Sequence, residues 1–205
     1  MSLVKYNNNS ISGITAASSL PTGAMTLIKE QTASSRATIS VVDGTSDVVL
    51  DSTYPIYLFT FINMHPATNN VDFQFNGSDD TSSHSFDITK TTTFFTAEHS
   101  ESGSEYFSYS TSGDLAQSTG YQRIFNGIGN VNDESCAGIL HLFDPSNTTF
   151  AKHFLGIFTG NRQANSNGVY YLGGYFNTTS AITALDFKVD SGNIDSGTID
   201  MYGVL

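Results

Sequence analysis

The chain has few residues of the types that build cross-linked, metal-binding or helix-rich proteins. Its 205 residues include one cysteine, no tryptophan and four prolines. A single cysteine, Cys136, excludes a disulfide within the chain and a cysteine-rich zinc site. Charged residues make up 13% of the sequence, about half the usual globular share, so charged helix surfaces are nearly absent. We therefore expect a turn-rich β-protein without disulfide bonds.

Positive charge is also scarce in this chain. Eight Lys and Arg residues stand against nineteen Asp and Glu residues, which gives a formal net charge of −11. The basic residues are scattered from Lys5 to Lys188. Because nucleic acids and anionic membranes repel such a surface, we expect neither as a partner. The N-terminal segment lacks the apolar block of a secretion signal, and no segment resembles a membrane helix, so we expect synthesis in a cytoplasm.

Short apolar runs separated by Gly, Asn, Asp and Ser follow one another along the chain. Their spacing of roughly 8–15 residues is typical of sandwiches and barrels. In residues 71–76 apolar and polar side chains alternate, so Val71, Phe73 and Phe75 should face the core and the polar residues between them the solvent. We predict an all-β fold, an antiparallel β-sandwich of jelly-roll type with about ten strands. The runs lie at 25–30, 36–42, 55–64, 71–77, 85–99, 105–111, 120–129, 137–145, 152–160, 169–177, 182–190 and 197–205.

Both ends of the chain carry specific predictions. Residues 1–22 should form an extended arm that docks on a neighbouring subunit, with a frayed terminus as the alternative. Residues 23–205 should form the β-sandwich domain. The final run has one apolar face, so it should complete a sheet beside the run 182–190. The arm residues expected to dock are Leu3, Val4, Tyr6 and Ile11.

Oxygen- and nitrogen-bearing side chains follow no metal-binding pattern. Counted from Asp190 as the first ligand of a calcium loop, Gly192 and Ile194 fall where oxygen ligands are required. No two histidines have the i, i+4 spacing of a helical zinc site. His141 and His153, expected on neighbouring strands, fit a hydrogen-bonded structural pair better than a zinc site. We predict no metal and no cofactor.

Catalytic motifs are missing as well. The acidic pairs Glu98/Glu101 and Asp186/Asp190 lack the arrangement found in glucanases of the sandwich class. A G-x-S-x-G motif, a P-loop and a dinucleotide fingerprint do not occur. Cys136 precedes an apolar run, which favours a buried inert thiol over a reactive nucleophile. We predict that the protein is not an enzyme, with a glucanase-like hydrolase as the weakest alternative.

The stretch 104–110 is a candidate binding surface. It places Tyr106, Phe107 and Tyr109 beside a serine-rich segment. If the rings are exposed, they would bind a glycan or a protein partner, and if they pack within the strand, they belong to the core. The sequence leaves both interpretations open.

Six strings, in this order, resemble a family of small virion structural proteins from marine tailed bacteriophages of the cyanophage and pelagiphage type. The resemblance covers nearly the whole chain, and its most specific parts are residues 65–68 and 192–203. It implies a component of the phage particle and supplies no catalytic residues. The strings are "SLVKYNNNSISGITAASSLPTGAMTLIKEQTAS", "FINMHPATNNVDFQFNGS", "ITKTTTFF", "HLFDPSNTTFAKHF", "GYFNTTSAITALDFK" and "SGNIDSGTIDMYGVL".

The resemblance and the composition together imply a non-enzymatic structural protein located in the virion and assembled in the host cytoplasm. The preferred expectation is a capsid decoration or cement protein that assembles by subunit contacts. Its partners would be copies of itself, in a homotrimer, and other virion proteins such as the major capsid protein or a tail protein. The alternative is a tail-fibre or tail-tip module that binds a host-surface glycan or receptor through residues 104–110.

Overall fold

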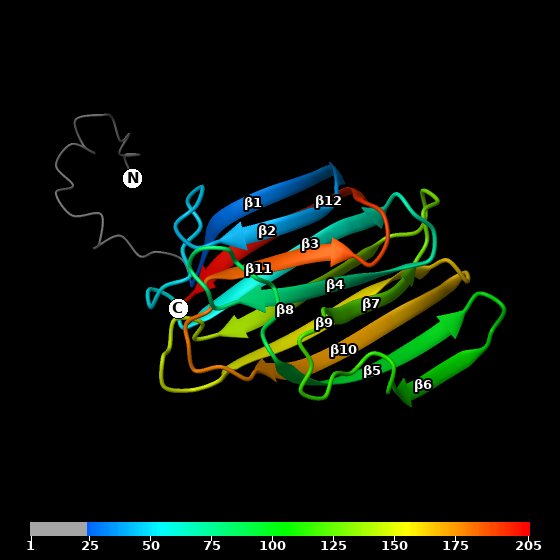
Figure 1. Cartoon of the computed structure of the whole chain (residues 1–205). Helices are drawn as coiled ribbons and strands as arrows, with labels where there is room; N and C mark the ends of the chain where they lie inside the picture. The colour runs from blue at the N-terminus through cyan, green and yellow to red at the C-terminus, as the bar shows by residue number, and fades with distance from the viewer. Residues whose placement is uncertain (1–23) are drawn as a thin grey trace, which may run out of the picture.

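The computed structural model describes residues 24–205, which form a twelve-stranded antiparallel sheet (Figure 1). Within this range no helix is long and apolar enough to cross a membrane. The all-β prediction is confirmed; each apolar run corresponds to one strand with shifted ends, and the structure has twelve strands where about ten were predicted. The strands are β1 (Met25–Arg36), β2 (Thr38–Val42), β3 (Ile56–Pro66), β4 (Val71–Ser78), β5 (Lys90–Ser100), β6 (Glu105–Tyr109), β7 (Gln122–Ile128), β8 (Cys136–Phe143), β9 (Lys152–Arg162), β10 (Ser166–Phe176), β11 (Ala184–Val189) and β12 (Ile194–Val204).

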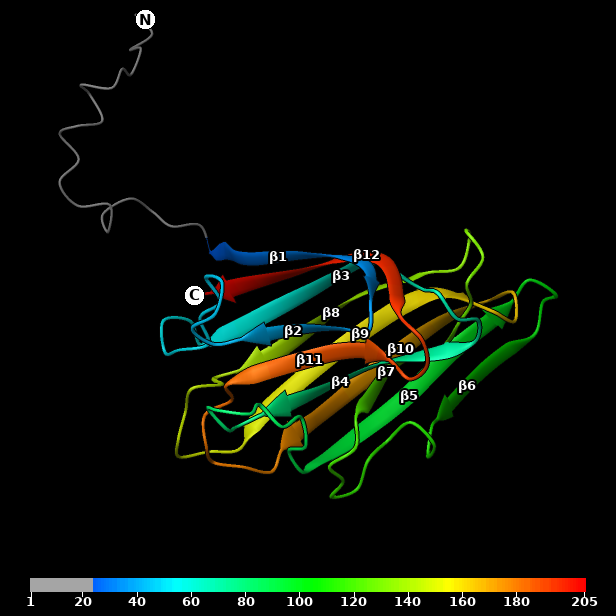
Figure 2. The same cartoon turned by 45° about the horizontal axis from the view of Figure 1, so that its top comes forward.

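The sheet folds back on itself at β9. Its longer part has the order β1-β12-β3-β8-β9-β10-β5-β6, and a single pair between Ile128 and Arg162 joins β9 to the shorter part, β7-β4-β11-β2. Figures 1 and 2 show the shorter part lying over the longer one. The far ends meet where Gln31 Nε2 of β1 donates to the carbonyl oxygen of Ser40 in β2 at 3.0 Å. The sheet is therefore nearly closed and barrel-like, and the predicted jelly-roll sandwich of about ten strands is not confirmed.

Phenylalanine rings fill the core between the two parts of the sheet. Phe61 of β3 meets Phe73 of β4 and Phe187 of β11, with ring centroids 5.7 and 5.1 Å apart. Burial of each such side chain stabilises the fold by roughly 1.5–3 kcal/mol. Val71, Phe73 and Phe75 are all buried, so the inward orientation predicted from their alternation is confirmed.

The polar residues of β4 depart from the prediction, because two of them are buried. Asp72 is 8% exposed and Asn76 is fully buried. The Nδ2 group of Asn76 donates to the carbonyl oxygens of Phe86 and Thr119. Loops 79–89 and 110–121 therefore cover Asn76, whereas Asp72 contacts Asn126 and Arg123 of β7. Alternation along one strand carries no information about contacts with such distant segments.

The C-terminal strand lies inside the sheet, but with partners other than those predicted. β12 pairs with β1 and β3, whereas β11 pairs with β2 and β4. The expected pairing of 197–205 with 182–190 is wrong. Residues 190–193 carry the chain from the shorter part of the sheet to the longer one, so these consecutive strands do not form a hairpin.

Candidate functional site

β6 is an edge strand whose two faces belong to different surfaces. Within the described chain it pairs with β5 alone, with Tyr106 opposite Glu98 and Tyr109 opposite Phe95. Directly opposite residues share a face and consecutive residues alternate, so Tyr106 faces one side and Phe107 and Tyr109 the other. All three are exposed, at 56%, 74% and 49%. They were predicted as one surface, and the structure divides them between two.

The side of β8, β9, β10, β5 and β6 that is turned away from the core is called the outer face below. One row of apolar side chains crosses all five strands. Adjacent strands in the sheet lie ~4.8 Å apart, so the row is about 19 Å long. The rings of Phe95 and Tyr171 stack with centroids 4.9 Å apart and planes 9° apart. In order, the row consists of Ile139, Ile157, Tyr171, Phe95 and Tyr109.

The outer face is almost free of charge. Beside the row, Leu155 and Phe107 are 49% and 74% exposed. Alternation assigns only one Asp, Glu, Lys or Arg, namely Glu105, to this face within the five strands. Three histidines, His99, His141 and His153, also belong to it, since they lie on paired strands in matching alternation. The low charge of this face contrasts with the net charge of −11 of the whole chain.

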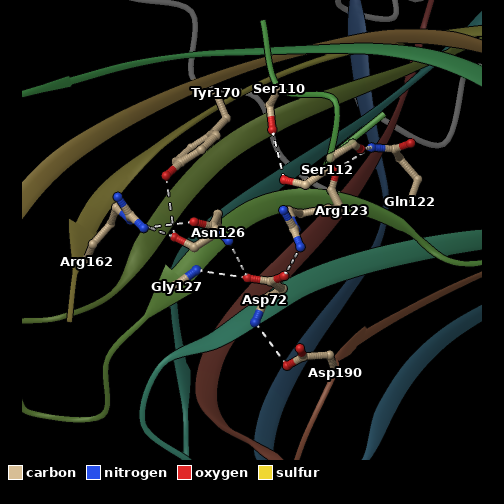
Figure 3. Close-up of polar contacts among 11 residues, drawn as sticks. Asp72, Ser110, Ser112, Gln122, Arg123, Asn126, Gly127, Arg162, Tyr170 and Asp190 are labelled. Atoms are coloured by element: carbon tan, nitrogen blue, oxygen red, sulfur yellow. Dashed lines mark hydrogen bonds and ion pairs between the residues drawn. The ribbon is translucent and has the colours of Figure 1, made fainter. Parts of the chain in front are cut away.

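Tyr106 lines a pocket on the opposite face, which we call the arginine pocket. Its volume is about 400 Å³. Figure 3 shows polar side chains of this region converging from several strands. The pocket holds two of the chain's eight Lys and Arg residues. Its principal polar residues are Glu98, Tyr106, Arg123, Asn126, Arg162 and Tyr170.

Arg162 is held on several sides by pocket residues. It pairs with the Glu98 carboxylate. Its Nη2 donates to Asn126 Oδ1 at 2.8 Å, and its Nε donates to the Asn126 carbonyl oxygen at 3.1 Å. The Tyr170 hydroxyl donates to Glu98 Oε1 at 2.9 Å, and burial raises the pKa of Tyr170, which keeps that proton in place. These contacts fix one wall of the pocket.

Arg123 has far fewer partners than Arg162. Its Nη2 lies 2.6 Å from Asp72 Oδ2, whereas its Nε is buried without a hydrogen-bond partner in the described structure. Asp72 Oδ1 accepts from Asn126 Nδ2 at 2.8 Å and from the Gly127 amide at 3.0 Å (Figure 3). The Arg123 side chain remains 22% exposed. It therefore retains donors that protein groups do not occupy.

The loop 110–121 closes the pocket beside Arg123 and is firmly anchored. Gln122 is fully buried; its Nε2 donates to the Gly113 carbonyl oxygen at 2.9 Å, and its Oε1 accepts from Thr92 Oγ1 at 2.6 Å. A Cβ on Gly113 would lie 2.3 Å from Phe94 Cδ1, so only glycine permits this approach. The loop thereby brings the hydroxyls of two lining residues, Ser110 and Ser112, within 3.4 Å of each other.

Three of the four acids in the pairs considered from sequence, Asp186, Asp190 and Glu98, contact neighbouring groups of the fold. Asp186 accepts from Ser40 Oγ at 2.5 Å and from the Tyr121 hydroxyl at 2.9 Å, and burial raises its pKa. Asp190 Oδ1 accepts from the Asp72 amide at 3.0 Å. Glu98 belongs to the Arg162 network. Among residues 24–205, no group of three or more His, Cys, Asp or Glu side chains is arranged to hold a metal ion.

The sequence also led to predictions about the reactivity of Cys136 and the docking of the N-terminal arm. Cys136 is 1% exposed, which confirms that it is buried, and burial raises the pKa of its thiol. A thiol with a raised pKa forms little of the reactive thiolate. The arm residues Leu3, Val4, Tyr6 and Ile11 lie outside the described residues.

Sequence reasoning missed Arg123, Arg162 and Asp72 as a group. Each lies on a different strand, at positions distant in the chain. The only signal was that basic residues are rare in the sequence. Such a signal does not show that the two arginines meet.

Comparisons with known proteins identify no relative of this chain. No family model matches the sequence, and neither a curated protein nor a solved structure matches it. The functional interpretation therefore depends on the two faces of β6 and on the resemblance seen in the sequence.

Proposed function

We propose that the protein is a non-enzymatic virion structural protein of a tailed bacteriophage, a capsid decoration or cement protein that assembles through its outer face. The observation that carries this proposal is the apolar row that crosses β8, β9, β10, β5 and β6. The sequence resemblance supports the phage particle as its location.

The composition of the outer face is typical of a subunit contact. The central part of a protein interface is depleted of charge and enriched in aromatic residues, as are the row and the adjacent Phe107. Burying apolar surface there stabilises a contact by ~25 cal/mol per Å². Large apolar side chains left in water at 40–74% exposure, such as Leu155, Ile157 and Phe107, would gain this energy on assembly.

Charge also favours a second copy of this chain as the occupant. Copies that each carry a net charge of −11 repel one another, and salt screens this repulsion over about 10 Å. A close contact between copies therefore requires a surface without acids. The outer face comes close to this requirement, because its only acids among the described residues are Glu105 within the five strands and Asp114, which accepts from the Tyr109 hydroxyl at 2.6 Å at one end of the row. A closed homotrimer would bury this face in a symmetric way.

The test compares two exposed phenylalanines in the full chain. Phe107 is 74% exposed on the outer face, and Phe150 is 70% exposed in the loop before β9. Light scattering after size-exclusion chromatography should show a trimer for the unsubstituted protein and for Phe150→Ser. The double variant Phe107→Ser with Ile157→Ser should be a monomer. In purified particles, the protein should occur in many ordered copies with this face covered.

Two results would end the proposal. One is a monomer at every concentration together with absence from purified particles. The other is loss of the trimer in Phe150→Ser but not in the outer-face variant, because it would locate the contact elsewhere.

A second candidate function is recognition of a host-surface glycan by a tail module. The observation that favours it is the position of Tyr106 beside a polar pocket. Copy number distinguishes the candidates, since a head decoration is present in many copies per particle and a tail module in few.

A further inference from the structure

We infer that the arginine pocket binds a neutral saccharide, with a pyranose ring against Tyr106 and its hydroxyls on Arg123, Ser110 and Ser112. This inference does not require the assembly role, because the pocket and the outer face lie on opposite sides of β6. It assigns a ligand class to the arginine pocket, which is not part of the apolar row proposed for assembly.

The first argument is the unused hydrogen-bonding capacity of Arg123. A guanidinium group has five N–H donors and no acceptor. Its Nη2 pairs with Asp72, and its Nε is buried, so the donors that a ligand can reach belong to the exposed part of the guanidinium, in a side chain that is 22% exposed. Ser110 and Ser112 bring two further hydroxyls into the same pocket, 3.4 Å apart. A ligand with several hydroxyls can both accept from the arginine and exchange hydrogen bonds with the serines.

Charge selects a neutral ligand over an anion. The two arginines are each paired with a carboxylate, Arg123 with Asp72 and Arg162 with Glu98. Two positive and two negative groups leave the region without net charge, inside a molecule of net charge −11. A carboxylate or phosphate ligand would approach Asp72 and Glu98 without a free cation to offset them. A sugar hydroxyl carries no such cost.

Tyr106 supplies the apolar contact that a sugar ring needs. The chain has no tryptophan, and this tyrosine is 56% exposed while lining the pocket. One face of a pyranose ring presents C–H groups that pack on an aromatic ring, while the hydroxyls at its edge reach polar groups. The volume of about 400 Å³ lies within the usual range for small ligands and suits one or two sugar units.

The pocket is also organised before any ligand binds. The Glu98, Asn126 and Tyr170 contacts hold Arg162, and Gln122 anchors the loop that carries the serines. Little side-chain ordering is then required on binding, which lowers its entropic cost. The strand ladder of β5 and β6 fixes Tyr106 opposite Glu98 at the same time.

The experiment is ligand-observed NMR and calorimetry on the purified full chain. The neutral probes are glucose, galactose, mannose and N-acetylglucosamine, and the acidic probes are glucuronic acid and inorganic phosphate. At least one neutral sugar should bind more tightly than either acidic probe. Tyr106→Ala should raise its Kd about fivefold to tenfold. The matched control is Phe107→Ala, the adjacent exposed residue on the opposite face, which should leave the Kd unchanged.

A second variant tests the role of Arg123 without removing its charge. Arg123→Lys keeps a cation beside Asp72 but loses the planar donor group, so it should also raise the Kd. Thermal unfolding of each variant should show an intact cooperative transition.

The inference is overturned if no neutral sugar binds, if glucuronic acid or phosphate binds more tightly, or if Phe107→Ala weakens binding as much as Tyr106→Ala does. These outcomes concern sugar binding, whereas the assembly proposal is tested by the oligomeric state. A failure here is therefore distinguishable from a failure of the assembly proposal.

Discussion

Tyr106 and Phe107 are consecutive residues whose side chains lie on opposite faces of the same edge strand. Tyr106 shares its face with Glu98 and lines the arginine pocket. Phe107 lies on the outer face with its ring centroid 6.2 Å from that of Phe95. One five-residue strand therefore contributes to two separate surfaces.

This division predicts that assembly and sugar binding can be removed one at a time. Tyr106→Ala should lose sugar affinity and keep the subunit number of the unsubstituted protein, because its side chain is absent from the outer face. Phe107→Ser should weaken assembly and keep the sugar Kd. Both quantities can be measured on the same preparations, by light scattering and by calorimetry. A variant that changes both together would show that the faces are coupled.

The Glu98→Gln substitution should destabilise the fold. It keeps the shape of the side chain but leaves Arg162 without its carboxylate and weakens the acceptor for the Tyr170 hydroxyl. Because both ionic side chains are about one-fifth exposed, we expect a loss of about 1–3 kcal/mol in the free energy of unfolding. Urea denaturation measures it. Glu105→Gln, at an exposed residue without an ion pair in the described structure, is the control and should change stability by less than about 0.5 kcal/mol.

Two adjacent glycines of β10 should respond oppositely to alanine. A Cβ on Gly174 would lie 2.8 Å from the Thr91 carbonyl oxygen and 2.8 Å from Phe154 Cζ, whereas a Cβ on Gly173 meets nothing closer than 3.6 Å. Gly174→Ala should therefore destabilise the protein by about 1–3 kcal/mol. Gly173→Ala should be neutral or stabilise it by up to about 1 kcal/mol, because glycine is entropically unfavourable in a strand. Equal thermal unfolding midpoints for both variants would contradict this assignment of faces.

Lys90 is a fully buried cation that ends on backbone carbonyls. Its Nζ donates to the carbonyl oxygen of Ile88 at 2.9 Å and to that of Gly120 at 2.6 Å. Burial lowers its pKa from 10.5 to about 8, and the negative charge of Asp87 opposes this shift only in part. The folded protein therefore releases this proton at a lower pH than the unfolded chain does.

The contribution of Lys90 to stability should rise between pH 8 and pH 10.5. In this window the unfolded chain binds the proton and the folded protein does not, so the free energy of unfolding increases with pH by up to about 3 kcal/mol from this group. Cys136, Tyr57 and Tyr170 act in the opposite direction above pH 9 to 10, because burial raises their pKa values and their unfolded forms ionise first. The clean measurement is the difference between the unsubstituted protein and Lys90→Met in urea denaturation.

That difference isolates Lys90, since both proteins share the other titrating groups. The free energy of unfolding of the unsubstituted protein should rise relative to that of Lys90→Met from pH 8 to pH 10.5. Below pH 7 the difference between the two should stay constant. A difference independent of pH across this range would show that the Lys90 pKa is ordinary in the folded state.

The pattern of apolar and polar residues along the chain is a local signal, so it predicts strands better than it predicts their neighbours. Apolar runs between turn residues overlap every strand, although about ten strands were predicted where twelve occur. Alternation predicted the inward orientation of Phe73 and Phe75, and the apolar run after Cys136 predicted that its thiol would be buried. Alternation failed for Asp72 and Asn76, because residues of β7 contact Asp72 and two loops distant in the chain cover Asn76. Another backbone approaches closely at Gly160 and Gly174, where a Cβ would lie 2.4 Å from the Ser135 carbonyl oxygen and 2.8 Å from the Thr91 carbonyl oxygen.

The amino-acid sequence by itself determined that this protein is built of strands, that Val71, Phe73 and Phe75 face inward, and that the chain carries excess negative charge. Only the tertiary structure decided that β12 lies between β1 and β3, that Arg123 and Arg162 meet beside Tyr106, and that five strands align one apolar row. The reason is that alternation depends on neighbours two residues apart, whereas strand order depends on which distant segments bury the most surface together.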